Sequence, residues 1–345
     1  MPGFTENDYE QTLIELFQRL GYQYECGYEV ERDFRQPCYV AELEAALRRL
    51  NPDVDESVLS DAKRLVTSIN EGTLEQRNET MMEYLQNGVE VKYVENGRNR
   101  TALVKLMDFS SVAQNRFKVV NQWSVEEYGK IRCDLVVFVN GLPLVVIELK
   151  SPSNENVEED DAYLQIKQYQ QKCPSMFVYN AFSVTSDMVT TKAGTITASE
   201  NRYMEWKSKN GDYSTEKLIP YDVFFEGIFE KERLLDILQN YICFDHKEGK
   251  ARKVMGAYHQ YFAVNKALVR AHLAYERQDG KGGVFWHTQG SGKSFSMVFF
   301  VHKLMMAVPG LTVVVVTDRN DLDQQLYEQF AGCSRFIRQV PQRVA

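Results

Sequence analysis

Two acidic residues and a lysine near the middle of the chain have a spacing that could support chemistry. Asp134, Glu148 and Lys150 lie in the segment 131–150, where two β-branched runs flank an Asn-Gly pair and predict a β-hairpin. A three-residue turn at 140–142 would place Asp134 directly across from Glu148, with Cα atoms on the order of 5 Å apart. Lys150, two residues beyond Glu148, would project from the same face. A two-residue turn would shift the pairing by one residue and separate the carboxylates.

This arrangement of charges suggests a metal-dependent reaction. Two adjacent carboxylates repel each other unless a cation lies between them. Mg²⁺ prefers oxygen ligands, and it can bind a scissile phosphate and acidify an attacking water. Lys150 could stabilise developing negative charge or orient that water. The alternative is a surface Glu–Lys pair, but the flanking apolar runs require burial, with the charges at strand ends as at the mouth of an active site.

A second constellation is the sequence HTQGSGKS at 287–294, which follows a predicted strand and opens a predicted helix. In a phosphate-binding loop the glycines let the backbone approach a phosphate, the lysine reaches the β and γ oxygens, and the serine holds Mg²⁺. The general pattern has glycine at its first position, where this chain has His287. The alternative is an ordinary Gly/Ser turn beside a lysine. The predicted loop residues are Gly290, Ser291, Gly292, Lys293 and Ser294.

The elements that would position these residues follow from the hydrophobic periodicity. Helical spacing predicts helices at 6–20, 41–50, 74–86 and 162–172. Strand character occurs at 177–186 and, as short edge strands, within 101–125; residues 186–220 are predicted to be mostly loops. Beyond a charged break at 245–253, the order is helix 258–277, strand 282–287, helix 291–307, strand 311–318 and helix 321–330. That order is the beginning of a parallel α/β domain, which needs further strands to be complete.

Length and composition limit the classes of protein. The chain has 345 residues, which favours two domains. A net charge of −8 disfavours a protein that coats nucleic acid by bulk charge, although a nuclease with one local DNA contact remains compatible. The six cysteines form no CxxC pair and predict neither zinc nor disulfides. No apolar run is long enough for a membrane span and the first residues contain no secretory signal, so a cytoplasmic location is expected.

The segment 131–150 resembles the core of PD-(D/E)xK nucleases. Asp134 matches the first acid and Glu148–Lys150 the ExK element, while Cys133 stands where the family usually has proline. The resemblance extends to Gln165 and Tyr169, which lie one helical turn apart and match the QxxxY element of the RecB-like branch. It also implies an additional acid in the first helix, for which Glu10 is preferred over Glu6 and Glu15. The implied metal ligands are Asp134, Glu148 and Glu10.

The second half resembles a superfamily 2 helicase motor. Gln260 corresponds to the Q motif, in which a glutamine reads the adenine edge, and 313–325 resembles motif Ia, which touches the DNA backbone. The resemblance implies ATP as a ligand. Walker B acids and a second RecA-like lobe have no counterpart in these 345 residues.

The order of the two parts is similar to that of the R (restriction) subunit of type I restriction enzymes. The implied fold is α/β, with a PD-(D/E)xK restriction-endonuclease-like core at 1–245 and a partial RecA-like P-loop domain at 250–345. The implied function is Mg²⁺-dependent cleavage of double-stranded DNA, coupled in the full protein to ATP-driven translocation. Methylation and specificity subunits are the expected partners, and the chain is expected to be an N-terminal fragment. The alternatives are a non-catalytic docking module of the same complex and a stand-alone RecB-like repair nuclease.

Overall fold

The computed structural model describes residues 5–150, 160–212, 220–247 and 249–343. The chain divides into two compact units. The first comprises Met1–Lys207 and Glu216–Leu235, and the second comprises Ser208–Thr215 and Asp236–Ala345. The predicted domains, 1–245 and 250–345, stay a prediction. No helix among the described residues is both long and apolar enough to cross a membrane.

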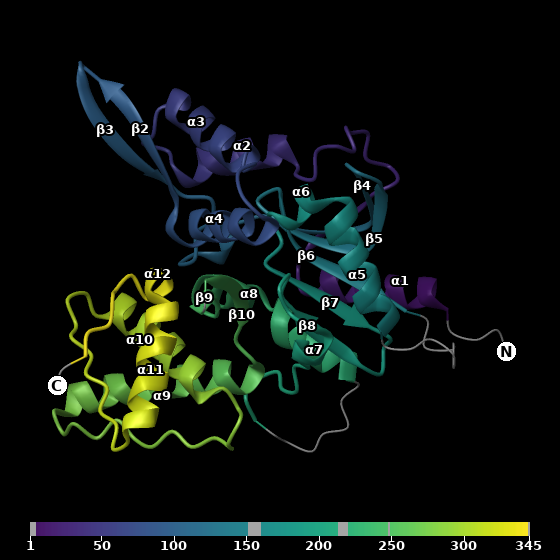
Figure 1. Cartoon of the computed structure of the whole chain (residues 1–345). Helices are drawn as coiled ribbons and strands as arrows, with labels where there is room; N and C mark the ends of the chain where they lie inside the picture. Colours follow the sequence, from purple (N-terminus) through teal and green to yellow (C-terminus); the bar gives the residue numbers. More distant parts are fainter. Residues whose placement is uncertain (1–4, 151–159, 213–219, 248, 344–345) are drawn as a thin grey trace. The chain divides into compact units, whose positions relative to one another are not determined.

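The first unit is built on a mixed six-stranded sheet (Figure 1). Its strands, in sheet order, are β1 (Gln23–Cys26), β4 (Phe117–Glu126), β5 (Lys130–Val139), β6 (Leu142–Leu149), β7 (Phe182–Ser186) and β8 (Thr191–Gly194). β1 and β4 are parallel, as are β6 and β7, and the other neighbours are antiparallel. The mixed α/β class is therefore confirmed. β4 is an inner strand, so the prediction of edge strands within 101–125 was wrong for this segment.

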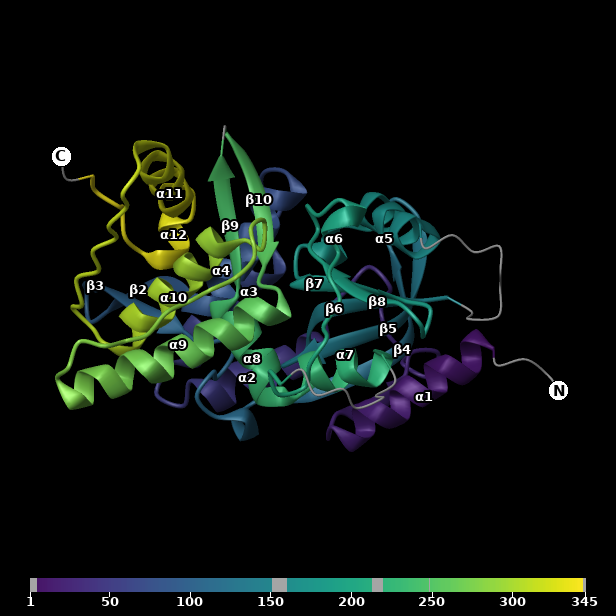
Figure 2. The same ribbon diagram turned by 90° about the horizontal axis from the view of Figure 1, so that it is seen from below.

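Helices cover both faces of this sheet (Figure 2). α1 (Glu6–Arg19) and α7 (Pro220–Phe229) lie on one face, and α5 (Asp160–Lys172) and the short α6 (Pro174–Phe177) lie on the other. α1 begins at Thr5 with a capping box to Asp8, and its apolar stripe is fully buried. Phe17 on that stripe contacts Phe225 and Phe229, with ring centroids 5.9 and 5.0 Å apart. α1 is therefore fixed to the sheet by aromatic packing.

The turn between β5 and β6 differs from the predicted three-residue turn. Val139 pairs with Leu142, so Asn140 and Gly141 form a two-residue turn, and both have positive φ as a type I′ turn requires. Further along, Leu135 pairs with Ile147, because a β-bulge at Leu144 inserts one extra residue into β6. The bulge cancels the register shift that the shorter turn would cause. Asp134 and Glu148 therefore come opposite each other by a different route from the predicted one.

Side-chain alternation is interrupted in β4 and β5 next to the acids. One hydrophobic cluster under α5 includes Val120, Trp123, Cys133 and Val136. Since side chains in a regular strand alternate between faces, the three-residue spacing shows a change of phase in both strands. The change occurs at Gln122, which has a φ of +51°, and at Asp134, which the register places opposite Gln122. A positive φ at glutamine is unfavourable, and such strain concentrates at functional sites.

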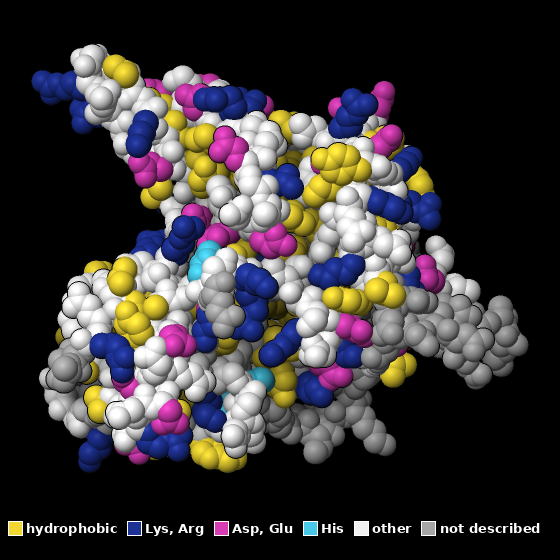
Figure 3. Space-filling view, in the orientation of Figure 1, with side chains coloured by type: hydrophobic (Ala, Val, Ile, Leu, Met, Phe, Trp, Pro, Cys, Tyr) yellow, Lys and Arg dark blue, Asp and Glu magenta, His cyan; other side chains and the backbone are white. Residues whose placement is uncertain are grey.

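The connection between the parallel strands β1 and β4 comprises residues 27–116. It holds α2 (Val40–Leu50), α3 (Glu56–Thr67) and α4 (Leu74–Asn87), then the ribbon of β2 (Val89–Glu95) and β3 (Arg98–Val104), and the 3₁₀ turn η1 (Val112–Gln114). α2 and α4 agree with the predicted helices, whereas α3 was not predicted. The β2–β3 ribbon extends into solvent with Lys and Arg side chains at its tip (Figure 3).

The second unit contains a hairpin and helices. Its elements are β9 (Ile242–Lys247), β10 (Lys250–Met255), α9 (Tyr258–Arg277), α10 (Lys293–Ala307), α11 (Asn320–Gly332) and α12 (Ser334–Ile337). α8 (Lys231–Asn240) begins in the first unit, and the 3₁₀ turn η2 (Glu200–Arg202) belongs to that unit. The predicted break at 245–253 is the β9–β10 hairpin.

The two strands predicted in the second unit, 282–287 and 311–318, are wrong. Neither segment pairs with another strand among the described residues, and Val284 and Val316 are 96% and 85% exposed. The reason is that β-branched residues form a strand only where a neighbour accepts the backbone hydrogen bonds. The predicted helices on either side, α9, α10 and α11, do form.

Candidate active site

The structure brings Asp134, in the middle of β5, next to Glu148, near the end of β6. The backbone N–H of Leu149 donates to Asp134 Oδ2 at 2.8 Å, which joins the end of β6 to the middle of β5. The Glu148 side chain is only 1% exposed, and its Oε2 has no hydrogen-bond partner among the described residues. A buried carboxylate oxygen without a donor is costly, so this atom calls for a cation or a proton.

The electrostatics of the pair agree with that requirement. Burial, with further repulsion from Glu6 and Glu10, raises the pKa of Asp134 to about 6. Burial and the neighbouring Asp134 hold the pKa of Glu148 well above its usual range. Both shifts mean that the doubly ionised pair is unfavourable without a positive partner. Two carboxyl groups with a free oxygen fit a hard divalent cation that keeps several waters, as Mg²⁺ does.

Lys150, Gln165 and Tyr169 form one hydrogen-bonded chain beside the acids. Lys150 Nζ lies 3.4 Å from Glu148 Oε1 and donates to Gln165 Oε1 at 2.6 Å. Gln165 Nε2 donates to the Tyr169 hydroxyl at 2.6 Å, and that hydroxyl donates to the carbonyl of Arg132 at 2.8 Å. The QxxxY pair on α5 therefore holds the ammonium group against Glu148 and is itself attached to β5.

Glu10 lies close enough to raise the pKa of Asp134, but other residues hold its carboxylate. Asn121 Nδ2 donates to Glu10 Oε1 at 2.8 Å, and Gln122 Nε2 donates to Glu10 Oε2. Within the described part of the chain, no three His, Cys, Asp or Glu side chains form a group that could hold a metal ion. Asp134 and Glu148 thus form a two-carboxylate pair, and Glu10 as a ligand stays a prediction.

Sequence reasoning missed the residues that bind Glu10. Gln122 connects Glu10 to Tyr28, whose hydroxyl donates to Gln122 Oε1 at 3.3 Å, and the Tyr24 hydroxyl donates to Asn121 Oδ1 at 3.2 Å. The available signal was the polar pair at 121–122, which stands between the apolar residues Val120 and Trp123. That signal does not reveal which helix faces it, because the contact joins residues more than a hundred positions apart.

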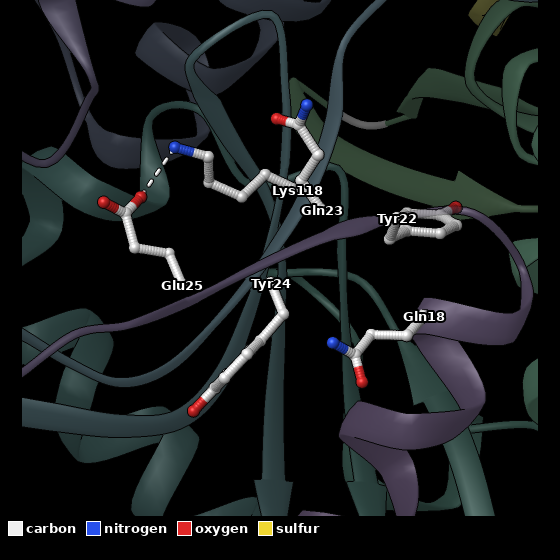
Figure 4. A pocket seen from close by; sticks show the side chains of 6 residues that line it. All are labelled: Gln18, Tyr22, Gln23, Tyr24, Glu25 and Lys118. Carbon is white, nitrogen blue, oxygen red and sulfur yellow. Dashed lines mark hydrogen bonds and ion pairs between the residues drawn. The ribbon is translucent and has the colours of Figure 1, made fainter.

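A cavity of about 540 Å³ lies elsewhere on the first unit, along β1 (Figure 4). Its lining residues are Gln18, Tyr22, Gln23, Tyr24, Glu25 and Lys118. Lys118 points toward Glu25 and forms an ion pair with it at 2.6 Å, and it also pairs with Glu42. None of the predicted catalytic residues lines this cavity, so it is not the acid site.

The raised pKa of Asp134 predicts how metal-free stability depends on pH. An acid whose pKa is higher in the folded state stabilises the fold below its unfolded value, about 3.9, and this contribution is lost as the pH rises through about 6. We expect the Asp134→Asn variant to lose less stability than the wild type between pH 4 and pH 7. Chemical denaturation across that range in chelator measures the difference. Parallel curves for the two proteins would show that Asp134 titrates normally.

The predicted phosphate loop is a separate site in the second unit. Gly290 and Gly292 have φ values of +81° and +75°, and Gly292 caps α10. Lys293 Nζ donates to the carbonyls of His287 and Thr288, at 3.0 Å each. The loop therefore curves around the ammonium group of its own lysine. A bound phosphate would have to replace these two carbonyls as the hydrogen-bond acceptor.

Gln260 on α9 contacts the same loop. Its Nε2 donates to the carbonyl of Gly292 at 2.9 Å, and its Oε1 accepts from the N–H of Ala257 at 2.8 Å. Ser291 and Ser294 lie in the loop and in the first turn of α10. The structure thus brings the predicted nucleotide residues together, with the amide of Gln260 engaged by the backbone.

Comparison with known proteins identifies the family. The family profile described as “Type I restriction enzyme R protein N terminus” matches residues 3–202, which include both acids and the QxxxY pair. The chain belongs to the type I restriction enzyme R protein family. A second profile, “SWI2/SNF2 ATPase”, matches residues 259–344 and covers the phosphate loop.

Relatives agree with this membership. The “Type I restriction enzyme HindI endonuclease subunit” of Haemophilus influenzae is 38% identical over 98% of this chain and 34% of its own length. A Methanocaldococcus jannaschii relative named MjaIXP is 33% identical over 94% of this chain and 34% of its own. The chain thus spans about a third of the length of the curated relatives it matches. The resemblance to R subunits inferred from the motifs is confirmed.

Proposed function

We propose that the first unit is the nuclease of a type I restriction R subunit and hydrolyses phosphodiester bonds of double-stranded DNA with Mg²⁺. The observation that carries the proposal is the buried, unpartnered Glu148 Oε2 beside Asp134, with Lys150 Nζ 3.4 Å from the other Glu148 oxygen. In this proposal the unit has a PD-(D/E)xK-type core within residues 1–245.

Six residues of the chain would divide the work. Asp134 and Glu148 would hold the Mg²⁺, with Glu10 at the edge of the site. When bound, Mg²⁺ supplies Lewis-acid activation of the phosphate and of the attacking water. Lys150, held by Gln165, directs its charge to the place where negative charge develops on the phosphate oxygens. Tyr169 keeps Gln165 in its orientation through the bond to the Arg132 carbonyl.

The second unit supports a proposed motor function in the longer protein. Residues 250–345 would belong to a RecA-like domain that binds ATP through Gly290–Ser294 and Gln260 and drives DNA translocation. Methylation and specificity subunits would choose the DNA site, which agrees with a chain whose net charge of −8 gives it little attraction to DNA in general.

A plasmid assay tests the nuclease proposal and its alternatives. We expect Mg²⁺-dependent nicking of supercoiled DNA by the restriction complex that contains this chain, and none by the Glu148→Gln variant. A complex that assembles but never cuts, with the acids intact, would favour the docking module. Digestion of linear DNA from its ends without ATP or partner subunits would favour a repair nuclease.

The 345-residue chain by itself should bind ATP weakly and hydrolyse it at no measurable rate. Its Lys293 ammonium is occupied by loop carbonyls, and the segments 282–287 and 311–318 that should support the loop are unpaired. Turnover also needs an arginine from a second lobe, worth roughly 10³ to 10⁵ in rate. Calorimetry with ATP and a phosphate-release assay measure both quantities. DNA-stimulated release that disappears in Lys293→Ala would contradict this expectation.

A further inference from the structure

We propose that Lys130 and Arg132, each supported by an aromatic ring, form a track on β5 that binds consecutive phosphates of the DNA strand next to the cleaved bond. The track, defined as Lys130, Arg132, Tyr28 and Phe34, begins two residues from Asp134. The inference rests on the proposed nuclease function and adds the residues that would align its substrate.

The burial pattern of β5 places both cations on one solvent-facing side of the strand. Lys130 and Arg132 are exposed, whereas Ile131 and Cys133 between and beyond them are buried in the hydrophobic cluster under α5. The opposite face of β5 therefore packs into the hydrophobic core. On the exposed face the two basic side chains contact aromatic rings, and their charged groups remain open to solvent.

Aromatic side chains from the loop after β1 hold these cations in place. The Arg132 guanidinium donates to the Tyr28 hydroxyl at 2.8 Å and lies 5.9 Å from the centre of that ring. Lys130 Nζ lies 4.9 Å from the ring centre of Phe34. Tyr28 is 65% exposed. Exposed aromatic rings interleaved with basic groups are typical of surfaces that bind nucleic acid strands.

The charges of the track are available to a ligand. Among the described residues, no carboxylate lies within ion-pair distance of Lys130 or Arg132, although Glu126 is the cross-strand neighbour of Lys130. In a chain with a net charge of −8, two uncompensated cations beside an acidic site are a local exception. Their charge is complementary to phosphate.

The spacing also suits a nucleic acid backbone. Residues two apart in a strand are separated by about 6.8 Å, so Arg132 and Lys130 lie at about 7 and 14 Å along β5 from Asp134. Steps of this size are comparable to the distance between successive phosphates of one strand. A scissile phosphate at Asp134 and Glu148 would therefore place its next two neighbours at Arg132 and Lys130.

The test measures DNA affinity apart from cleavage. The probe is a fluorescein-labelled duplex of about 30 base pairs, titrated in chelator at salt concentrations from about 50 to 200 mM, so that no hydrolysis occurs. The proteins are restriction complexes that contain the wild-type chain, the double variant Lys130→Ala/Arg132→Ala, or a matched control, Lys92→Ala/Arg98→Ala, which removes the same charge from the exposed β2–β3 ribbon.

Each phosphate contact contributes about 0.9 to the slope of log affinity against log salt concentration. We expect the slope of the track variant to be smaller in magnitude than the wild-type slope by about 1.8. The ratio of wild-type affinity to variant affinity should therefore fall about tenfold between 50 and 200 mM salt. The control should keep the wild-type slope, and thermal unfolding should show all three proteins folded.

An unchanged slope in the track variant, or an equal loss in the control, would overturn the track. These outcomes are independent of the proposed function, because absence of Mg²⁺-dependent nicking by the wild-type complex would contradict the nuclease without altering the salt slope. Nicking that persists with an unchanged slope would contradict only the track.

Discussion

Replacing Lys150 by alanine should abolish DNA cleavage by the restriction complex and leave ATP hydrolysis and translocation intact. Lys150 is the cation nearest to Glu148, and its ammonium group is already oriented by Gln165. Loss of one positioned charge at a reacting oxygen reduces rates by about 10² to 10³ or more. In the proposed function, ATP hydrolysis and translocation depend instead on the loop at Lys293. Plasmid cleavage and phosphate release, measured on the same complex, test the loss of cleavage and the retention of ATP hydrolysis.

Lys105→Ala is a suitable control, because Lys105 is exposed and lies in the same unit. It should cut at the wild-type rate. The variant Gln165→Ala should fall between the two, since it keeps the ammonium group and removes only its 2.6 Å partner. A complex with Lys150→Ala that also stops hydrolysing ATP would show that the two sites are coupled, which is contrary to the proposed separation.

Deleting Leu144 and Val145 together should also abolish cleavage, although both side chains are buried and neither belongs to the acid pair. Leu144 is the unpaired extra residue of the β-bulge, so its loss alone leaves Val145 opposite Val137 and Ile147 opposite Leu135. Loss of the second residue moves the residues beyond 145 by one position, and Glu148 turns to the opposite face from Asp134. Val146 would then leave the core, at a cost above the roughly 2 to 5 kcal/mol of one large-to-small substitution.

Deleting Leu144 alone is the matched control that separates register from simple damage to the fold. The hairpin then pairs regularly from the Asn140-Gly141 turn onward, without the bulge, and Glu148 stays opposite Asp134. We expect this single deletion to keep cleavage within about tenfold of the wild type, together with most of the melting temperature. Plasmid cleavage and thermal unfolding measure both, and loss of cleavage in a folded single deletion would mean that the bulge itself, and not only the register, is needed at the site.

The sequence predicts the acid pair well because both acids belong to one hairpin. Local strand propensity and the Asn-Gly pair determine which strands form. Burial of the apolar runs 135–139 and 144–147 determines where the strands lie in the sheet. The prediction reached the correct register through a turn that does not exist, since a bulge at Leu144 leaves no local signal comparable to Asn-Gly. Glu10, Gln165 and Tyr169 were placed by resemblance and by helical spacing.

Other features could not be predicted, because they depend on contacts between distant residues. The positive φ of Gln122 and its bond to Glu10 require α1 and β4 to meet. The segments 282–287 and 311–318 have strong strand propensity, yet propensity alone does not form a strand without a neighbour. The phosphate loop was predictable as a motif. The hydrogen bonds from Lys293 to carbonyls of its own loop were not.

The separation of α1 and α7 along the chain has a consequence for the order in which the site is completed during synthesis. α1 packs through Phe17 on Phe225 and Phe229 of α7, and Glu10 is held by Asn121 and Gln122. A ribosome adding about 5 to 20 residues per second needs roughly 10 to 40 s to pass from residue 17 to residue 229. During that interval the side of α1 that packs on α7 lacks this partner. The acids and the QxxxY pair are all synthesised by residue 169, so they emerge before the helix that completes the packing of α1, and Glu10 reaches its final position only when the first unit is nearly complete.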